Sequence, residues 1–217
     1  MNYRSQSAMP PVVMNLIIVN ILAFMATYML DKWDFIIGNF ALFPVESPFF
    51  EIWQPFTYMF LHGGFTHLFF NMFSLWMFGR ALEWEMGWKR FLIYYVGCGV
   101  GAGIVQLGIA QIDLAHIGGN IGERINYLCT PTIGASGSVF GLLLAFGMLH
   151  PNATIMLLIP PIPMKAKWFV IIYGLLELIL GVYGSGGIAH FAHLGGMFWG
   201  WLLLTWWERR DRNRYIY

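Results

Sequence analysis

The sequence predicts an all-α polytopic membrane protein. Of its 217 residues, 58% are hydrophobic and 11% are charged, which is too little charge to cover a water-soluble globule of this size. The apolar residues also fall into runs of about 20, the length at which a helix rising ~1.5 Å per residue crosses ~30 Å of hydrocarbon. A net charge of +1 gives no reason to expect a nucleic-acid partner, which would require a basic face.

Six apolar runs are candidates for membrane spans. In order they are residues 11–30, 57–79, 91–112, 133–149, 168–183 and 188–207. The first run is longer than the apolar part of a usual signal peptide, so we interpret it as a retained span. The fourth is among the shortest, and Gly or Pro at both ends predicts that its outer end lies below the membrane surface. The expected domains are a leader (1–10), a membrane domain (11–207) and a basic tail (208–217).

The lysines and arginines between the spans predict the orientation. With the N-terminus inside, ten of the twelve fall in inner segments, and only Lys32 and Arg124 fall outside. Short cytoplasmic loops carry the excess of Lys and Arg, so both termini are expected in the cytoplasm. The connection 31–56 is rich in aromatic residues and broken by proline, which is typical of a structured loop at the outer interface.

Polar residues gather in the outer halves of the second, fourth and sixth spans. They are His62, His67 and Asn71, then Ser136 and Ser138, then His190 and His193. Such groups are costly in lipid and are expected to face one another or a water-filled cavity. His67 and Asn71 are four residues apart and share a helix face, whereas His62 is expected to point elsewhere.

Small residues predict which spans lie closest together. Gly137 and Gly141 form one GxxxG pair and Gly196 and Gly200 form another, and such faces allow two helix backbones to approach closely. Packing these faces together would bring Ser136 within reach of His193. Ser138 is expected to serve helix packing only.

A serine beside a histidine indicates nucleophilic catalysis, because the imidazole can accept the hydroxyl proton. The carboxylate that usually orients such a histidine has one clear candidate within the spans, Glu177. Nothing in the sequence directs Glu177 toward His193, so we expect a Ser–His dyad and a bundle-facing hydrogen bond for Glu177. His67, Asn71 and the Ser136 backbone N–H are the candidate donors to a developing oxyanion.

Three sequence motifs resemble those of the rhomboid family of intramembrane serine proteases. They are His62-Gly-Gly-Phe-Thr-His67-Leu-Phe-Phe-Asn71, Gly134-Ala-Ser-Gly137 and Ala192-His-Leu-Gly-Gly196, in that order and on the second, fourth and sixth spans. The resemblance implies a six-transmembrane-helix rhomboid-like bundle. It also implies that Ser136 is the nucleophile, that His193 rather than His190 is the general base, and that His67 and Asn71 stabilise the oxyanion.

Two positions depart from the family pattern. Gln54 follows Trp53 where the family often has arginine, and Phe140 stands where some members have a tyrosine that stacks on the catalytic histidine. Neither change removes a reacting group. Glu83 and Glu85 are expected to balance nearby basic residues, and Cys98 and Cys129 are expected too far apart in depth for a disulfide.

The predicted function is that of an intramembrane serine endopeptidase acting on single-span membrane proteins near the outer leaflet, without a cofactor. The expected partners are transmembrane substrates and membrane lipids, and the expected location is a bacterial cell membrane, with the active site opening to the outer side. Two alternatives stay open. One is a non-catalytic binder of transmembrane clients, and the other is a metalloenzyme or metal transporter using His62, His67, His190 and His193.

Overall fold

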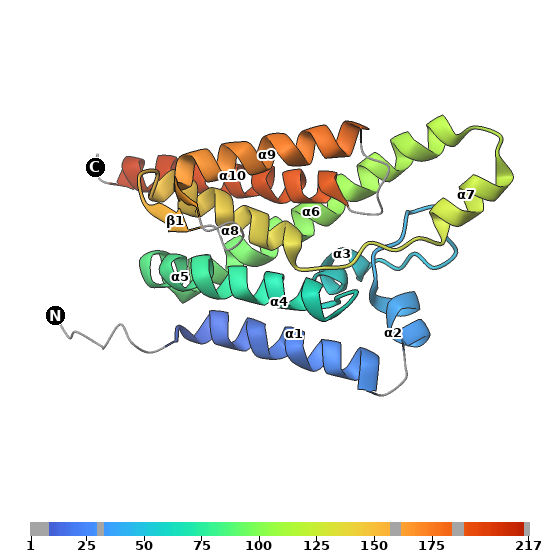
Figure 1. The fold of residues 1–217 in the computed structure, drawn as a ribbon, viewed down its shortest axis with the longest axis horizontal. Helices are drawn as coiled ribbons and strands as arrows, with labels where there is room; N and C mark the ends of the chain where they lie inside the picture. The colour runs from blue at the N-terminus through green and yellow to red at the C-terminus, as the bar shows by residue number, and fades with distance from the viewer. Residues whose placement is uncertain (1–8, 30–32, 157–161, 184–188, 215–217) are drawn as a thin grey trace.

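The computed structural model describes residues 9–29, 33–156, 162–183 and 189–214. This part of the chain is mostly helical (Figure 1). The longer helices are α1 (Pro11–Met29), α6 (Trp88–Ile117), α8 (Ser136–Leu149), α9 (Ala166–Tyr183) and α10 (His190–Arg214). The shorter ones are α2 (Trp33–Phe40), α3 (Gln54–Thr57), α4 (Phe65–Ser74), α5 (Arg80–Met86) and α7 (Ile121–Leu128). Among these helices α1, α6 and α9 are long and apolar enough to cross a membrane, and α8 is a shorter apolar helix.

The predicted second span is interrupted in the structure. A 3₁₀ turn at Tyr58–Phe60 follows α3, and α4 begins only at Phe65. The break falls on Gly63 and Gly64, because glycine disfavours a helix interior. After α4 the chain passes through a π-helical turn, Leu75–Gly79, directly into α5.

Two helices extend beyond the apolar runs from which they were predicted. Helix α6 adds residues at both ends of 91–112, and α10 continues through the polar segment after residue 207 to Arg214. Hydropathy marks only the apolar part of a helix, whereas Lys, Arg and Glu are also good helix formers. Arg90 of α6 and Asp211 of α10 form an ion pair, with 2.8 Å between Nη1 and Oδ2, that joins these extensions.

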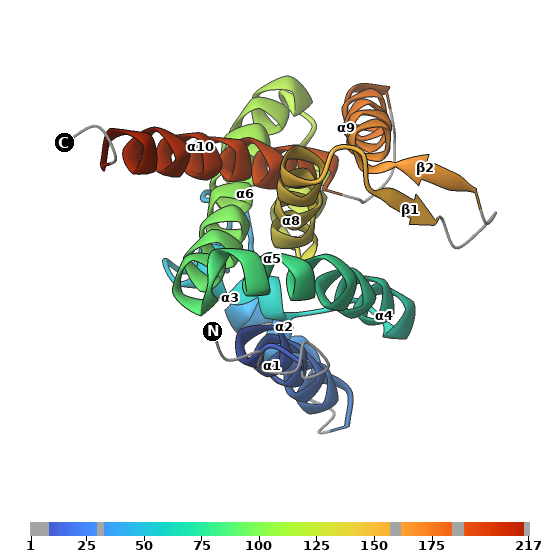
Figure 2. The same ribbon diagram turned by 90° about the vertical axis from the view of Figure 1, so that its left-hand side faces the viewer.

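Helix α8 lies in the middle of the bundle. Figure 2 shows it surrounded by α6, α9, α10 and the α4–α5 segment, and α10 has its most extensive contacts with α6 and α8. Most α8 residues are buried. The short predicted span 133–149 therefore forms the central element of the fold.

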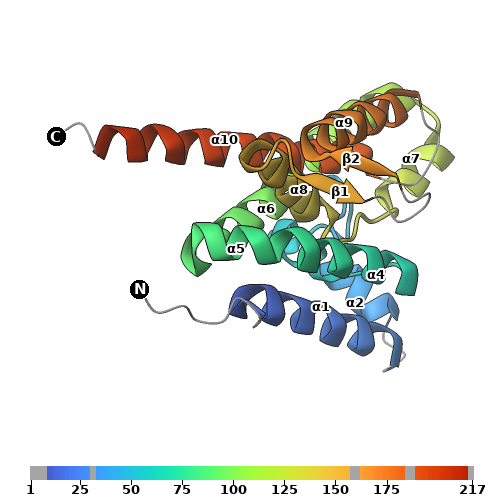
Figure 3. The same ribbon diagram turned by 60° about the vertical axis from the view of Figure 1, so that its left-hand side comes forward.

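Helix α1 lies beside α4 and α5 (Figures 1 and 3). The buried carboxylate of Glu83 on α5 accepts hydrogen bonds from the backbone N–H groups of Val12, at 3.0 Å, and Val13, at 2.7 Å. Glu83 therefore caps the first turn of α1, whose N–H groups have no partner within the helix. Glu85, on the same helix, pairs with His150 at 2.8 Å between Oε2 and Nε2.

Helix α1 begins and α10 ends at the same end of the molecule, while α2 and α7 lie at the other (Figure 1). At that second end the segment 33–56 is structured, as predicted. Buried Gln54 accepts a hydrogen bond from Phe43 N–H and donates one to the Phe49 carbonyl. Gln54 thus cross-links this segment from the position where the family often has arginine. Arg124 of α7 forms an ion pair with Glu46.

A short antiparallel hairpin was not predicted. Strand β1 (Thr154–Met156) pairs with β2 (Pro163–Lys165) between α8 and α9. Parts of the predicted leader, loops and tail, namely residues 1–8, 30–32, 184–188 and 215–217, lie outside the described residues.

Candidate active site

Ser136 is the first residue of α8 and is half-buried. Its Oγ lies 2.7 Å from Nε2 of His193, which is in the first turn of α10. The hydrogen bond between these two side chains is the contact expected from the small-residue faces. The first N–H groups of α8 have no acceptor within the helix, so its N-terminus also presents partial positive charge beside Ser136.

Glycines explain how closely α8 and α10 approach. A Cβ atom at Gly196 would overlap the backbone carbonyl of Gly137, and one at Gly141 would lie 3.2 Å from the Gly196 carbonyl oxygen. Only residues without a side chain permit this distance. Ser138, on the same helix, donates to the Tyr95 carbonyl at 2.8 Å, as expected for a packing residue.

His193 is held on two further sides. The ring of Phe140 stacks on it with 4.3 Å between centroids and an angle of 6° between the planes, so phenylalanine fills the stacking position in place of tyrosine. The Nδ1 atom of His193 lies 2.9 Å from Oε2 of Glu177 on α9. An ionised carboxylate only accepts hydrogen bonds. His193 therefore carries its proton on Nδ1, which leaves Nε2 free to accept from Ser136.

No contact between Glu177 and His193 was expected, and the structure differs from the sequence prediction on this point. Glu177 forms the bundle-facing hydrogen bond that was predicted, and its partners are two histidines, His193 and His190. The Nδ1 atom of His190 lies 2.7 Å from the same Glu177 oxygen, Oε2. The separations of His190 and His193 from Glu177 in sequence are 13 and 16 residues, far beyond the three or four residues that separate neighbours on one helix face. The available signal was the order of the chain, because consecutive helices joined by a short connection are usually antiparallel neighbours.

His67 lies against the backbone that leads into Ser136. A Cβ atom at Gly134 would be 2.8 Å from His67 Nε2 and 3.6 Å from Ser136 Oγ, and Gly134 has a φ of +132°. Glycine is thus required there for both space and backbone conformation. His67 Nδ1 accepts from Gly63 N–H at 3.3 Å, so the neutral ring carries its proton on Nε2, on the side of Gly134 and Ser136.

Asn71 is buried one turn further along α4, and its Nδ2 donates to the His67 carbonyl at 2.9 Å. One of its two amide protons is used in this way. His62 was expected to point away from His67, and this prediction is wrong. It precedes α4, is buried, and packs edge-on against His67 with 5.0 Å between ring centroids. Helical spacing did not apply to His62 because it lies in the break before the helix.

The predicted four-histidine set is divided into two places. His62 and His67 pair beside Gly134, whereas His190 and His193 converge on Glu177. Within the described residues, Glu177, His190 and His193 each offer one potential ligand atom, all within 4.8 Å of one another. That spacing is compatible with a divalent metal. It is equally the spacing of two N–H groups that share one carboxylate oxygen.

These features define a class, namely a helical membrane bundle with the side-chain arrangement of a serine hydrolase at the start of its central helix. A family model described as the Rhomboid domain matches residues 50–209. The chain therefore belongs to the rhomboid family of integral membrane proteins.

Named relatives agree with this assignment. The rhomboid relative YdcA of Bacillus subtilis (strain 168) is 32% identical over 167 residues, which cover 76% of this chain and 72% of YdcA. Rhomboid protein 1, mitochondrial, of Saccharomyces cerevisiae is 27% identical over 196 residues, 88% of this chain and 49% of that protein. The rhomboid protease GluP of Bacillus subtilis is 32% identical over 93 residues, 43% of this chain and 15% of GluP. The chain thus spans about half the length of the yeast relative and a smaller part of the length of GluP.

Proposed function

We propose that this protein is an intramembrane serine endopeptidase that hydrolyses peptide bonds in or near the membrane spans of single-span proteins. The observation that carries the proposal is the 2.7 Å contact between Ser136 Oγ and His193 Nε2. This distance is within the range needed for a base to accept the proton of a serine nucleophile. A non-catalytic binder of transmembrane clients would not require this pair.

In the proposed reaction, Ser136 Oγ attacks the carbonyl carbon of the substrate while its proton passes to His193 Nε2. The C–N bond then breaks as protonated His193 returns that proton to the leaving amine, and the acyl part stays as an ester on Ser136. Water attacks the ester, loses a proton to His193, and releases the acid as Ser136 regains its hydroxyl proton. Ser136 and His193 have different roles in these steps, so each can be tested separately.

The oxyanion of the tetrahedral intermediate would be stabilised by N–H donors around Ser136. His67 Nε2–H faces the Gly134 backbone beside Ser136, and Asn71 has one amide proton beyond its bond to the His67 carbonyl. The backbone N–H of Ser136 at the helix N-terminus is the third donor. Preorganised donors of this kind lower the barrier because they need no reorganisation during the reaction.

We propose that six spans place both termini in the cytoplasm of a bacterial cell and open the site to the outer side. Substrates would be single-span proteins with a helix-weakening segment near the outer leaflet, because a helical peptide bond is shielded by its own hydrogen bonds. By the family resemblance, a small residue would precede the cleaved bond.

Cleavage of a model single-span substrate by purified protein tests the proposal. We expect Ser136→Ala and His193→Ala to abolish cleavage, because each removes a group that forms or breaks a bond, while His190→Ala retains measurable cleavage and a chelator has no effect on the wild type. Full activity of Ser136→Ala would contradict the serine mechanism. Inhibition by the chelator would favour a metal held by Glu177, His190 and His193.

A further inference from the structure

Glu177 lies at the junction of two helices and is shared by two histidines. Its Oε2 is 2.7 Å from His190 Nδ1 and 2.9 Å from His193 Nδ1. The three side chains are between 10% and 13% exposed, so little water competes for these bonds. The Glu177 carboxylate thus accepts one hydrogen bond from His190 and a second from His193.

We infer that Glu177 is a positioning residue for catalysis, which orients His193 and stabilises its protonated form during the reaction. The inference rests on the proposed function, since it assigns Glu177 a role only if His193 is the base. It extends that function from a pair of residues to a chain that runs from Ser136 through His193 to Glu177 and His190.

The orientation follows from the two ring nitrogens. A neutral imidazole has one N–H and one lone pair, and the bond to Glu177 keeps the proton on Nδ1. The lone pair on Nε2 then points at Ser136 Oγ, 2.7 Å away. Phe140 restrains the plane of the same ring by stacking, but a stacked ring can still turn within its plane. The Glu177 bond removes that freedom.

The charge of Glu177 matters as the proton moves. When His193 takes the Ser136 proton it becomes an imidazolium, whose positive charge then lies 2.9 Å from the carboxylate oxygen. In surroundings that exclude most water, such a contact is stronger than at the surface. The interaction exists in full only after proton transfer, so it lowers the barrier rather than tightening substrate binding.

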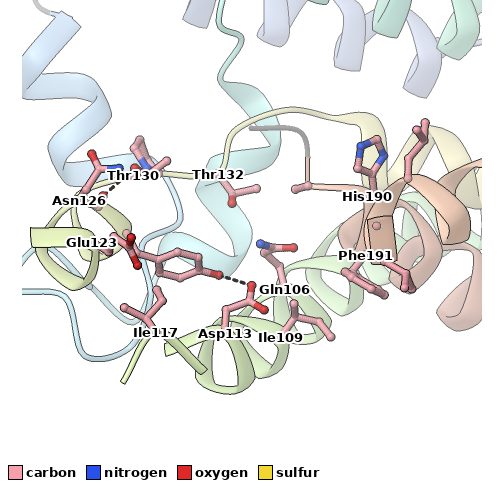
Figure 4. A pocket seen from close by; sticks show the side chains of 16 residues that line it. Gln106, Ile109, Asp113, Ile117, Glu123, Asn126, Thr130, Thr132, His190 and Phe191 are labelled. Atoms are coloured by element: carbon pink, nitrogen blue, oxygen red, sulfur yellow. Dashed lines mark hydrogen bonds between the residues drawn. The ribbon is translucent and has the colours of Figure 1, made fainter. Parts of the chain in front are cut away.

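His190 serves this arrangement from the other side. Its hydrogen bond occupies the same oxygen and fixes the Glu177 side chain against α10. His190 also lines a polar pocket of about 680 Å³ between α6, α7, α9 and α10, together with Gln106 and Asp113 (Figure 4). The network that begins at Ser136 therefore reaches, through Glu177, a residue that lines this pocket. His190 makes its contact with Glu177 and has no described bond to Ser136, so it supports the base indirectly.

Kinetics of Glu177→Gln test the inference. The Gln side chain has the same shape, and its carbonyl oxygen can accept the same hydrogen bonds, but it has no charge. We expect kcat to fall by about tenfold or more while KM stays within about twofold, because the lost interaction belongs to the transition state. Glu177→Met, which removes the hydrogen bonds as well, is expected to lose at least as much kcat.

Two controls separate the possible outcomes. Glu85→Gln removes the charge from a similar Glu–His contact, 2.8 Å between Glu85 and His150 at the other end of the molecule, and is expected to cleave at the wild-type rate. Thermal unfolding reports the folded fraction of each variant. Wild-type kcat in folded Glu177→Gln would overturn the inference, as would a fall in kcat fully explained by unfolded protein. If either result were found while Ser136→Ala remained inactive, the proposed serine protease function would stand and only the role of Glu177 would be overturned.

A metal in this cluster is the competing interpretation. Elemental analysis of the purified wild type is expected to find no stoichiometric zinc. Stoichiometric zinc, together with loss of cleavage on chelation, would overturn the inference, because the Nδ1 atoms would then be ligands rather than donors to Glu177.

Discussion

His193 illustrates what can be learned from single residues. The sequence alone indicated four candidate site residues, Ser136, His193, His67 and Asn71. Polar groups inside apolar spans are costly in lipid and therefore mark candidate functional sites. The structure brings the first two into hydrogen-bond contact and places His67 beside them, while the catalytic roles of all four remain predictions. Glu177 could not be assigned, since its contact with His193 depends on how α9 and α10 align, and residue spacing does not fix that alignment.

Gly134 gives a prediction at the same scale. Gly134→Ala would place a methyl 2.8 Å from the His67 ring, at a φ of +132° that alanine rarely adopts. The strain is of the order of 1–3 kcal/mol, and His67 must shift to relieve it. We expect kcat to fall by about tenfold. This loss is smaller than the fall of about 100-fold or more caused by removing an oxyanion donor, because His67 is displaced and not removed.

The matched control is Gly108→Ala, because nothing lies within 4 Å of a Cβ atom at Gly108. This variant is expected to keep the wild-type kcat. An unchanged kcat in Gly134→Ala would contradict the placement of His67 in the reaction.

At the scale of elements, hydropathy predicted where the helices are better than where they end. The bounds of α1 and α9 agree with the predicted spans to within a few residues, whereas α6 and α10 continue into polar sequence. Apolar runs report burial in lipid or protein, and helix propensity extends beyond them. The break before α4 depends on two adjacent glycines, and the β1–β2 hairpin is too short to give a clear alternation of apolar and polar residues.

Glu83 shows a second limit of the sequence at this scale. It was expected to balance basic residues, yet it is buried and caps α1 from about 70 residues away, as the separations of 70 and 71 show. A cap supplied by another helix leaves no local pattern such as a capping box. Contacts of this kind require the fold to be known first.

At the scale of the whole molecule, the start of α1 and the end of α10 lie at the same end, opposite α2 and α7 (Figure 1). The distribution of Lys and Arg predicts that this end is cytoplasmic. Both cysteines are free, as expected. Cys98 is buried and Cys129 is exposed, so the chain contains its own reporter of orientation.

A membrane-impermeant maleimide applied to intact cells is therefore expected to label Cys129 and not Cys98. Cys129 directly follows α7, at the end predicted to face outward. Cys129→Ser should abolish the labelling. Labelling of Cys129 only after the membrane is opened would reverse the proposed orientation.

The central claim is that His193 activates Ser136 as a nucleophile. The most direct measurement is reaction of the purified protein with a fluorophosphonate, followed by mass spectrometry of the modified peptide. The account predicts one adduct on Ser136 in the wild type and none in Ser136→Ala or in folded His193→Ala, because the hydroxyl needs a base to react. An adduct on Ser138, or an undiminished reaction at Ser136 without His193, would contradict it.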